Sequence, residues 1–558
     1  MARIIGIVLL SLVQAIHAQS SFIVASTSPA SAGTPLPAFI SYSIEFCFFP
    51  DYAGNTSNPN TFSNNLLNNL GHFQGSKPHI RVGGNTQDYA LYNASLPYAV
   101  NGTFNAAKAA DYPTTVYIGP SYFESYSTWP DVKFSHGFNM GLGGSSSAGW
   151  QTLLDTVPLA CKALEGGKLL MWEYGNEPDL FSTSAQGPVR PPSWNESTYV
   201  SQWLNGSRQI KEGVAAACPD LASYGFMAPS FAGVENHLNP VTTWNDGLDV
   251  DKDIELISSH NYIGGATQPG VTLQGTLMNH TQTVISVARQ LNVSNLLASS
   301  NIPFILGETN SLYNQGAPGL SNAYGAALWN LDFALYGASK NIHRIQYVKF
   351  LETIPPDFHI DNPSRSFHTG LSFRYAAWQP QDTEINPKGT KPPYYGNIAT
   401  AAFLSNLTAS TITIAEIPLS NAMESAYAAY ANGALKRIII INMHEYNYTV
   451  NGTSTVLNPV PRPIRNYTVT IPSHATNSPD YYAPAPLPKS ATLRALHANG
   501  SDAITGITYD GYSYNYELNN GLPVRLTNVT VGQKVRVVGG KLIVPVEDSG
   551  AVTIDFGA

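Results

Sequence analysis

Between residues 36 and 400, eight short apolar runs alternate with longer stretches that are compatible with helices. The runs cover residues 39–46, 79–83, 137–142, 169–174, 223–228, 254–260, 304–306 and 344–350. Strands that alternate with helices form βαβ units around a parallel sheet. Eight such units fit a closed (β/α)8 barrel, the TIM-barrel fold. The sequence therefore predicts an α/β protein with a catalytic-type barrel over residues 36–400.

The character of the sequence changes after residue 400. Seven β-rich runs follow, at residues 437–442, 466–471, 492–496, 513–518, 534–538, 541–546 and 551–556. Turn signals such as Asn432-Gly433 separate them, which predicts an all-β sandwich domain over residues 401–558. Gly539-Gly540 predicts a hairpin between two of these runs. Residues 21–25 predict a strand, within an N-terminal segment 19–35, that joins the same domain.

The N-terminus has the features of a secretory signal peptide. Arg3 gives a positive start, residues 4–16 are mostly apolar, and Ala18 is a small residue suited to the position before a cleavage site. We expect residues 1–18 to be removed and the mature protein to be extracellular. No other segment is long and apolar enough to span a bilayer, so the sequence predicts no membrane partner.

Charged residues make up 12% of the chain, about half the usual share, so other groups must keep its surface soluble. About thirteen Asn-x-Ser/Thr sequons are present, and such sites accept N-glycans in secreted proteins. They include Asn55, Asn93, Asn195, Asn292, Asn406, Asn451, Asn466 and Asn528.

The chain has three cysteines, so one disulfide is possible and one thiol is left over. Cys161 and Cys218 both lie in helix-like stretches and are the first candidate pair, whereas Cys47 lies in an apolar run typical of a buried thiol. The sequence leaves the other pairings open. It contains no CxxC motif and no His/Cys cluster, so it predicts neither a metal site nor a cofactor.

The formal net charge is −8 and the isoelectric point is about 5.9. The 29 basic residues are spread along the chain without a basic run. Nucleic acids and heavily sulfated glycans bind through fields of Lys and Arg. The composition therefore argues against both as partners.

Two carboxylates stand where strands end. Glu177 lies in WEYGNEPD (residues 172–179), after the fourth apolar run, and Glu308 lies in FILGET (residues 304–309), at the seventh. In (β/α)8 barrels the carboxyl ends of the strands surround the active site. Hydrolysis of a glycosidic bond needs two carboxyl groups, one to protonate the leaving oxygen and one to attack or to activate water. Asn176, next to the first carboxylate, offers an amide that can bind a sugar hydroxyl.

Residues 306–321 (LGETNSLYNQGAPGLS) and 328–332 (LWNLD) resemble the nucleophile segment of glycoside hydrolase family 79, the family of β-glucuronidases and heparanases. Four further segments resemble the family in the same order, namely residues 43–45 (SIE), 81–85 (RVGGN), 176–178 (NEP) and 260–262 (HNY). Together with the β domain, the resemblance covers nearly the whole mature chain.

The resemblance implies a retaining hydrolase that acts on β-linked hexuronic acid, with Glu177 as the acid/base and Glu308 as the nucleophile. It implies that Asn176 holds the 2-hydroxyl of the sugar and that Glu45 and Asn85 contact hydroxyls on the far side of the ring. His260 is implied to line the site. Tyr313, with its neighbour Asn314, and Tyr375 are implied to lie near the uronate carboxylate.

The residues around these positions suggest how the site is completed. Trp172, Tyr174 and Tyr262 can supply apolar walls and hydroxyl groups. Arg81 and Arg344 are candidate carboxylate ligands, but both lie in strand runs, which favours pairing inside the barrel. Tyrosine hydroxyls and backbone amides are therefore the preferred ligands. Local roles are expected for three other acids, with Asp88 and Asp179 capping or pairing nearby and Glu173 contributing to structure.

Three functions fit the sequence. The first is a secreted exo-β-glucuronidase that removes terminal glucuronic acid, or its 4-O-methyl form, from glycans by double displacement. The second is an endo-acting, heparanase-like glycosidase, which the low basic content argues against. The third is a non-catalytic glycan-binding protein, which the presence of both glutamates argues against.

Overall fold

The computed structural model describes residues 20–103, 105, 108, 113–184, 188–349, 374–382, 387–452, 455–472 and 488–557. The predicted signal peptide lies outside these residues. Within the described part of the chain, no helix combines the length and the apolar character needed to cross a membrane.

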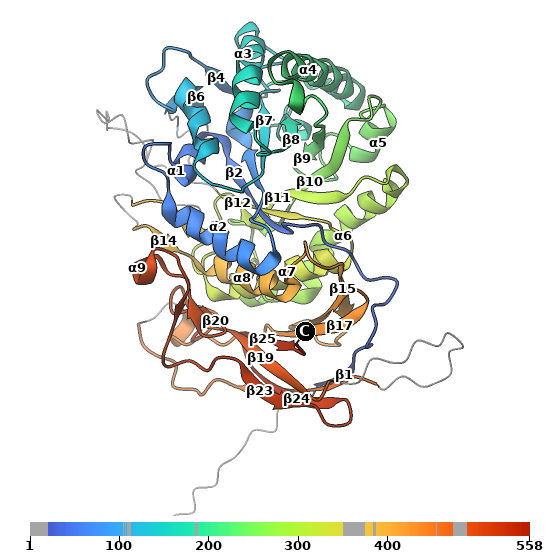
Figure 1. Ribbon diagram of the computed structural model, residues 1–558, viewed down its shortest axis with the longest axis vertical. Coiled ribbons are helices and arrows are strands. Elements are labelled where there is room, and N and C mark those ends of the chain that lie inside the picture. The colour runs from blue at the N-terminus through green and yellow to red at the C-terminus, as the bar shows by residue number, and fades with distance from the viewer. Residues whose placement is uncertain are drawn as a thin grey trace, which may run out of the picture.

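Eight parallel strands close into a barrel (Figure 1), which confirms the predicted (β/α)8 fold. In chain order they are β2 (Ile40–Glu45), β3 (Ile80–Gly83), β7 (Phe134–Phe138), β8 (Leu169–Tyr174), β9 (Phe226–Phe231), β10 (Ile254–Gly265), β11 (Phe304–Tyr313) and β12 (Ile345–Lys349). The last strand closes on the first, with Ile345 opposite Ile40.

Two strands lie at different positions from those predicted. The third barrel strand begins at Phe134 rather than residue 137, and the fifth begins at Phe226 rather than residue 223. The third strand reads FSHGF, and its buried residues include Ser135 and His136. Polar residues that are buried in the barrel wall hide such a strand from a search for apolar runs.

Helices surround the barrel: α1 (Phe49–Ala53), α2 (Thr61–Gln74), α3 (Ser147–Leu164), α4 (Glu196–Ala217), α5 (Pro240–Asn245), α6 (His280–Leu296), α7 (Tyr324–Ser339) and α8 (Pro392–Leu404). Asparagines cap several N-termini, as Asn195 does by accepting a hydrogen bond from the backbone of Thr198 at 2.9 Å. Every residue of α7 is buried, because this helix lies between the barrel and the β domain (Figure 1). A helix covered on all sides is apolar all round.

Short elements complete the barrel domain. A small sheet, β4 (Ala90–Tyr92), β6 (Thr115–Ile118) and β5 (Val100–Thr103), extends from the loop that follows β3. The pair β13 (Trp378–Gln379) and β14 (Gly389–Thr390) precedes α8.

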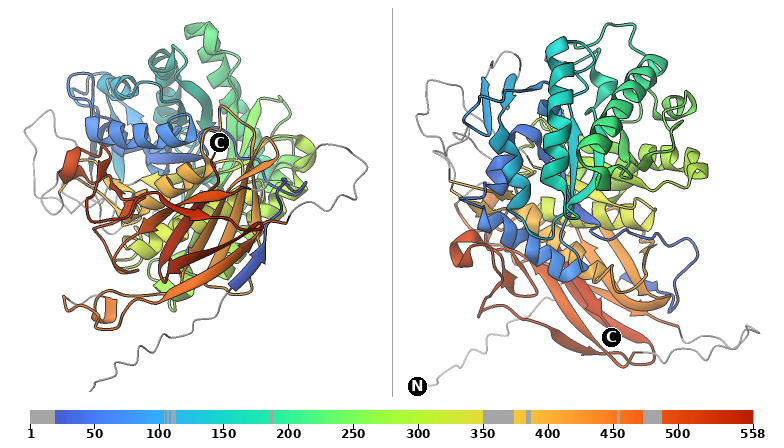
Figure 2. Two further views of the ribbon diagram at one scale, coloured as in Figure 1. Left: turned by 60° about the horizontal axis from the view of Figure 1, so that its bottom comes forward. Right: turned by 45° about the horizontal axis from the view of Figure 1, so that its top comes forward.

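The C-terminal domain contains two sheets that face each other (Figure 2). Within the described residues, the larger sheet consists of β15 (Ile412–Ile417), β16 (Glu424–Ala431), β17 (Ala434–Asn442), β25 (Gly550–Asp555), β19 (Ser490–His497), β20 (Thr508–Tyr509), β21 (Tyr512–Ser513), β22 (Val524–Arg525) and β23 (Gln533–Arg536). The smaller sheet consists of β1 (Ser20–Ile23), β18 (Ile464–Thr470) and β24 (Lys541–Glu547). Phe22, Val469 and Val544 of the small sheet share one core with Ile440 and Ile554 of the large one.

Three features of this domain differ in part from the expectations. Residues 513–518 form the end of β21 and the short helix α9 (Tyr516–Asn519), not one strand. The alanine-rich strand β16 was not predicted, because alanine has a weak preference for strands. Gly539-Gly540 forms a tight turn in which Val538 and Lys541 exchange backbone hydrogen bonds of 2.9 and 3.0 Å. Val538 and Lys541 thus form the antiparallel bridge of the predicted two-residue hairpin turn, but the hairpin extends no further, since β23 pairs with β19 and β24 pairs with β18.

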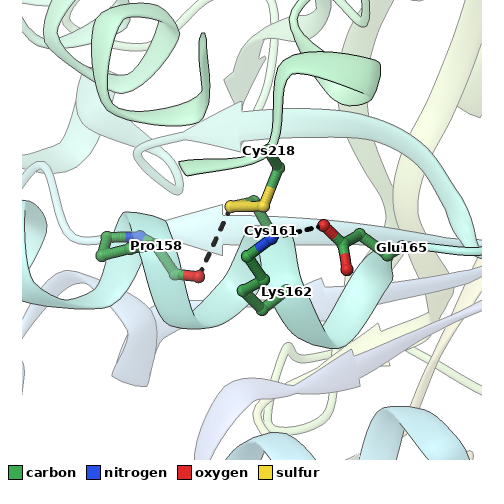
Figure 3. The surroundings of a disulfide bond; sticks show 5 residues. All are labelled: Pro158, Cys161, Lys162, Glu165 and Cys218. Carbon is green, nitrogen blue, oxygen red and sulfur yellow. Dashed lines mark hydrogen bonds and ion pairs between the residues drawn. A yellow bond between two sulfur atoms is a disulfide. The ribbon is translucent and has the colours of Figure 1, made fainter. Parts of the chain in front are cut away.

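A disulfide joins Cys161 of α3 to Cys218, the residue that follows α4, with a Cα–Cα distance of 6.1 Å (Figure 3). The first candidate pair is thus confirmed, and Cys47 is a buried free cysteine as expected. The bond joins the two neighbouring helices that follow β7 and β8, and the second of these helices begins after the loop that carries Glu177.

Candidate active site

Glu177 and Glu308 meet at the mouth of the barrel, although they lie 131 positions apart in the sequence. Glu177 follows the carboxyl end of β8, and Glu308 lies within β11. One oxygen of each carboxyl group lies within 4.8 Å of the other. Two carboxyl groups at this spacing can flank a single anomeric carbon.

Both oxygens of Glu308 are held by hydrogen-bond donors. The Tyr262 hydroxyl donates to Oε1 at 2.7 Å, and Nη1 of Arg81 donates to Oε2 at 2.8 Å. Glu308 is only 5% exposed, and Arg81 is fully buried. The carboxylate is thus fixed in direction and paired with a cation.

Arg81 uses the rest of its guanidinium to connect the other residues of the site. Its Nε donates to Glu173 at 2.8 Å, and its Nη2 donates to Oδ1 of Asn176 at 2.7 Å. Nη1 also donates to the Ser43 hydroxyl at 2.9 Å. The expected pairing of this arginine inside the barrel is thus present, and it extends to the candidate nucleophile.

Glu177 adopts a left-handed backbone conformation, with φ 50° and ψ 47°. Its N–H donates to the carbonyl of Ser230 at 2.9 Å, which ties the loop after β8 to the end of β9. Nδ1 of His260 lies 2.8 Å from Oε1 of Glu177.

The pKa values of Glu177 and His260 are shifted in opposite directions. Burial raises the pKa of Glu177 to about 7, assisted by the charge of Glu173 and opposed by that of Arg81. Burial lowers the pKa of His260 to about 4, so its imidazole is neutral at neutral pH. A buried carboxyl group with a raised pKa, next to a second carboxyl group, is the arrangement that a general acid requires.

Asn176 is held from three sides. Its N–H donates to Oδ2 of Asp88 at 2.7 Å, its Oδ1 accepts from Arg81, and its Nδ2 donates to Oδ1 of Asn85 at 3.0 Å. Asp88 also accepts from the backbone N–H groups of Met140 and Gly141. Asp88 thus pairs locally, as expected, and it fixes the backbone of Asn176 next to Glu177.

Asp179 also pairs locally, as expected. It accepts from the backbone N–H of Ala232 at 2.9 Å and from Nδ2 of Asn236 at 2.8 Å.

Glu45 lies at the end of β2, where it accepts hydrogen bonds from the N–H of Thr86 at 2.6 Å, from the Thr86 hydroxyl, and from the N–H of Asn85 at 3.2 Å. Burial raises its pKa to about 8, and the charge of Glu308 contributes. Gly84 has φ +105°, and a Cβ at this position would lie 2.3 Å from Oε2 of Glu45. The glycine therefore allows the backbone to approach the carboxyl group.

Aromatic rings lie beside Glu308. The Tyr262 ring centroid is 6.4 Å from that of Tyr313 and 6.3 Å from that of Tyr375. Tyr313 ends β11 and is 47% exposed, whereas Tyr375 is buried. Asn314 follows in a left-handed turn, with φ 60°, and is exposed. The structure thus places the tyrosines together and Asn314 farther out.

Three candidates lie away from the site. Tyr174 faces α4, where a Cβ on Gly206 would lie 2.1 Å from its ring, and Trp172 packs against Phe138. Neither forms a wall of the site, because alternate residues of β8 point outward to the helices. Arg344 donates to the carbonyl of Pro37 at 3.1 Å at the amino end of β12, at the opposite end of the barrel.

Sequence reasoning assigned no role to Ser230. Its hydroxyl donates to Oε1 of Glu173 at 2.5 Å, while its carbonyl holds the backbone of Glu177. Ser230 lies on β9, and it contacts the site only because β9 lies beside β8. No local sequence motif predicts these contacts.

Among the described residues, the His, Cys and acidic side chains grouped closely enough to ligate a metal ion are Glu177, His260 and Glu308 themselves. Arg81, at 2.8 Å from Glu308, already supplies a positive charge there and would repel a second cation. The arrangement therefore favours acid/base and nucleophilic chemistry by the side chains.

Comparison with known proteins gives consistent results. A family model described as "Glycosyl hydrolase family 79 C-terminal beta domain" matches residues 426–553. A β-glucuronidase of Neurospora crassa is 52% identical over 549 residues, covering 95% of this chain and 93% of the relative. A β-glucuronidase of Aspergillus niger is 52% identical over 526 residues, covering 93% of this chain and 91% of the relative.

Solved structures share the architecture. A 4-O-α-L-rhamnosyl-β-D-glucuronidase from Fusarium oxysporum has a TM-score of 0.71 at 22% identity, covering 96% of this chain and all of the other. A family 51 α-L-arabinofuranosidase from Bifidobacterium longum has a TM-score of 0.56 at 12% identity, covering 96% of this chain and 99% of the other. At these identities the likeness concerns the fold alone.

Proposed function

The chain belongs to glycoside hydrolase family 79, and from this premise we propose that it is a secreted, retaining exo-β-glucuronidase. It would remove terminal β-linked glucuronic acid, or its 4-O-methyl form, from glycans. Both fungal relatives named above are β-glucuronidases. The observation that carries the proposed mechanism is the separation of at most 4.8 Å between one oxygen of Glu177 and one of Glu308.

That separation supports double displacement. Carboxyl groups about 5–5.5 Å apart are typical of retaining glycosidases, whereas inverting enzymes need about 6.5–9.5 Å to accommodate a water molecule. In the first step a Glu308 oxygen bonds to the anomeric carbon, while Glu177 gives its proton to the departing glycosidic oxygen. In the second step Glu177 takes a proton from water, the water oxygen bonds to the anomeric carbon, and the bond to Glu308 breaks.

The surrounding residues support these roles. Arg81 and Tyr262 aim the Glu308 carboxylate, and the environment of Glu177 raises its pKa to about 7, so it can act as an acid below neutrality. Asn176, held by Asp88 and Arg81, is placed to bind the hydroxyl next to the anomeric carbon. Glu45 and Asn85 lie on the neighbouring strand ends, where they can contact the other side of the ring.

Recognition of the uronate carboxylate is assigned to tyrosines. Arg81 is fully buried and engaged by Glu173 and Glu308, so it is not available for a substrate carboxylate. Tyr313 and Tyr375 each lie close to Tyr262 at the side of Glu308. Their hydroxyl groups can donate to a carboxylate without adding a charge.

The charge of the protein supports exo action on a single terminal sugar. An endo-acting enzyme on a long sulfated chain needs a cationic cleft, and this chain has a net charge of −8 with 29 basic residues. We therefore place an endo-acting, heparanase-like activity second.

Secretion and N-glycosylation form part of the proposal. The Cys161–Cys218 disulfide suits an oxidising compartment. Of the sequon asparagines named above, Asn93, Asn195, Asn292, Asn406, Asn466 and Asn528 are exposed. The masses of tryptic glycopeptides, measured before and after enzymatic deglycosylation of protein secreted by a fungal host, identify which of them carry glycans.

A panel of p-nitrophenyl glycosides tests the activity. Release from the β-glucuronide, with none from the α-arabinofuranoside or β-xyloside, is the expected result. Cleavage of heparan sulfate without action on the small glucuronide would select the endo-acting alternative. Binding of glucuronidated oligosaccharides without turnover would indicate a glycan-binding protein.

A further inference from the structure

Glu173 is a third buried carboxylate beside the two that the mechanism uses. It lies on β8, four residues before Glu177, and its side chain is fully buried inside the barrel. One of its oxygens accepts from Nε of Arg81 at 2.8 Å, and the other accepts from the Ser230 hydroxyl at 2.5 Å. A buried carboxylate is costly unless it is paired, and the proposed mechanism assigns it no step.

The first contact connects Glu173 to the nucleophile. Arg81 is shared, since its Nε contacts Glu173 and its Nη1 contacts Glu308, both at 2.8 Å. One positive charge thus faces two carboxylates. Glu173 accepts from Nε of the guanidinium, so Nη1 can donate to Glu308 and Nη2 can donate to Asn176.

The second contact connects Glu173 to the acid/base. Ser230 donates its hydroxyl to Glu173, and its backbone carbonyl accepts from the N–H of Glu177 at 2.9 Å. Ser230 has φ +54°, a conformation that non-glycine residues seldom adopt and that needs support from neighbours. The hydroxyl is also 3.0 Å from that of Ser258 on β10.

We propose that Glu173 is a positioning residue for hydrolysis: by holding Arg81 on one side and Ser230 on the other, its carboxylate sets the placement of Glu308 relative to Glu177 and the field at the acid/base. This inference rests on the proposed function. Glu173 itself does not touch the substrate.

The charge of Glu173 acts on several titratable groups. The groups whose pKa it affects are Arg81 from β3, His260 from β10, Tyr199 from α4, and Glu177 and Asp88 from the loops after β8 and β3. After burial, which is the larger cause, the charge of Glu173 contributes to the raised pKa of Glu177, while Arg81 opposes it. Removing the charge of Glu173 leaves the opposing effect of Arg81 uncompensated.

Glu173→Gln is the test substitution, because glutamine has the same shape without the charge. Its amide replaces one of the two acceptor oxygens with an NH2 donor, so either Arg81 or the Ser230 hydroxyl loses its acceptor. We expect kcat on p-nitrophenyl β-glucuronide to fall by roughly 10- to 100-fold, with KM changed by less than about threefold. The alkaline limb of kcat/KM should move to lower pH by about half a unit to one unit.

Glu212→Gln on α4 is the matched control, because Glu212 is exposed and its carboxylate accepts a hydrogen bond from Gln209 of the same helix. It should leave both kcat and the pH profile unchanged. Ser230→Ala removes one of the two contacts of Glu173 while keeping the Arg81 pair. Ser230→Ala should lower kcat by roughly three- to tenfold. If Glu173→Gln does not fold, Ser230→Ala tests the inference in its place.

Wild-type activity on the glucuronide decides the proposed function, whereas the ratio of variant to wild type decides the role of Glu173. Wild-type kcat together with an unchanged alkaline limb in Glu173→Gln would overturn the inference. A lower melting temperature and lower kcat with an unmoved alkaline limb would also overturn it, since a merely structural role predicts that result.

Discussion

Arg81 and Glu308 form an ion pair inside the barrel mouth, with Nη1 of the guanidinium 2.8 Å from Oε2 of the carboxylate. The arginine is fully buried and the glutamate nearly so. The pair joins β3 to β11, and Tyr262 holds the second oxygen of the carboxylate at 2.7 Å. A nucleophile held at both oxygens presents one direction of attack to the anomeric carbon.

Glu308→Gln should remove almost all activity, because an amide cannot form the covalent glycosyl intermediate. We expect kcat on p-nitrophenyl β-glucuronide to fall by roughly 10⁴-fold or more, the scale of loss seen when a covalent nucleophile is removed. Initial rates with purified protein provide the measurement, and Glu212→Gln serves as the control. Activity within tenfold of wild type would show that another group attacks.

Activity should decline as the pH rises through about 7, the value to which burial raises the pKa of Glu177. The sign follows from its role, since an acid catalyst works only while it is protonated. The profile of kcat/KM against pH provides the measurement. A plateau that extends to pH 9 would contradict the assignment of the acid.

Glu177→Gln should discriminate between leaving groups. A p-nitrophenol leaves with little protonation, whereas a sugar or alkyl alcohol needs a proton from the enzyme. We therefore expect a loss of roughly 10²-fold or more on an alkyl or disaccharide glucuronide and a smaller loss in glycosylation by the aryl glucuronide. Single-turnover rates with both substrates test this, and equal losses in this step would contradict the role as acid.

The disulfide should contribute measurably to stability, since it closes a loop between residues 57 apart in sequence. The chain-entropy relation gives about 4 kcal/mol for a loop of this length, and measured values are often lower. Replacing both Cys161 and Cys218 by Ala should lower the midpoint of guanidinium unfolding. Reducing agent should lower the midpoint of the wild type and leave that of the double variant unchanged, and equal midpoints without reductant would contradict the contribution.

His280 connects the barrel to the β domain. Its Nδ1 lies 3.0 Å from Asp332 of α7, and its Nε2 lies 3.3 Å from Glu416 of β15. Burial lowers the pKa of His280, but Asp332 and Glu416 outweigh this effect and raise it to about 10. The hydrogen bond from His280 lowers the pKa of Glu416 to about 2. The imidazolium therefore forms ion pairs with Asp332 of the barrel domain and with Glu416 of the β domain.

His280→Asn should cost about 1.5–3 kcal/mol of stability at pH 5.5, the usual scale for hydrogen bonds to charged groups. A raised histidine pKa gives stability that is complete below the unfolded value of about 6.5 and is lost as the pH rises through 10. Calorimetry at pH 5.5 and pH 9.5 should show a smaller difference from wild type at the higher pH. The exposed His72, replaced in the same way, is the control, and a difference that grows with pH would contradict the ion pair.

The barrel and its two central acids could be predicted from sequence because both depend on local patterns. The stretches before Glu177 and Glu308 are apolar, and each acid stands where the chain reaches the mouth, so eight-strand topology alone brings them together. The approximate strand positions followed from the same pattern, except where polar residues such as Ser135 are buried in the barrel wall.

The supporting network could not be predicted, because its contacts join strands far apart in sequence. Glu173 looks like any acid in a strand until Arg81 and Ser230 are seen on either side of it. The outward direction of Tyr174 depends on the side-chain alternation of β8 relative to α4. At Gly539-Gly540 the turn itself was recognisable, but the separation of its two strands into different sheets depends on pairing with β18 and β19.

The stereochemistry of the first product tests most directly whether Glu177 and Glu308 flank one anomeric carbon for double displacement. Proton NMR spectra, recorded within the first minutes after enzyme is added to p-nitrophenyl β-glucuronide, distinguish the anomers before mutarotation. The β-anomer of glucuronic acid should appear first, with the α-anomer growing in later. Initial release of the α-anomer would show inversion and contradict the assignment of Glu308 as the nucleophile.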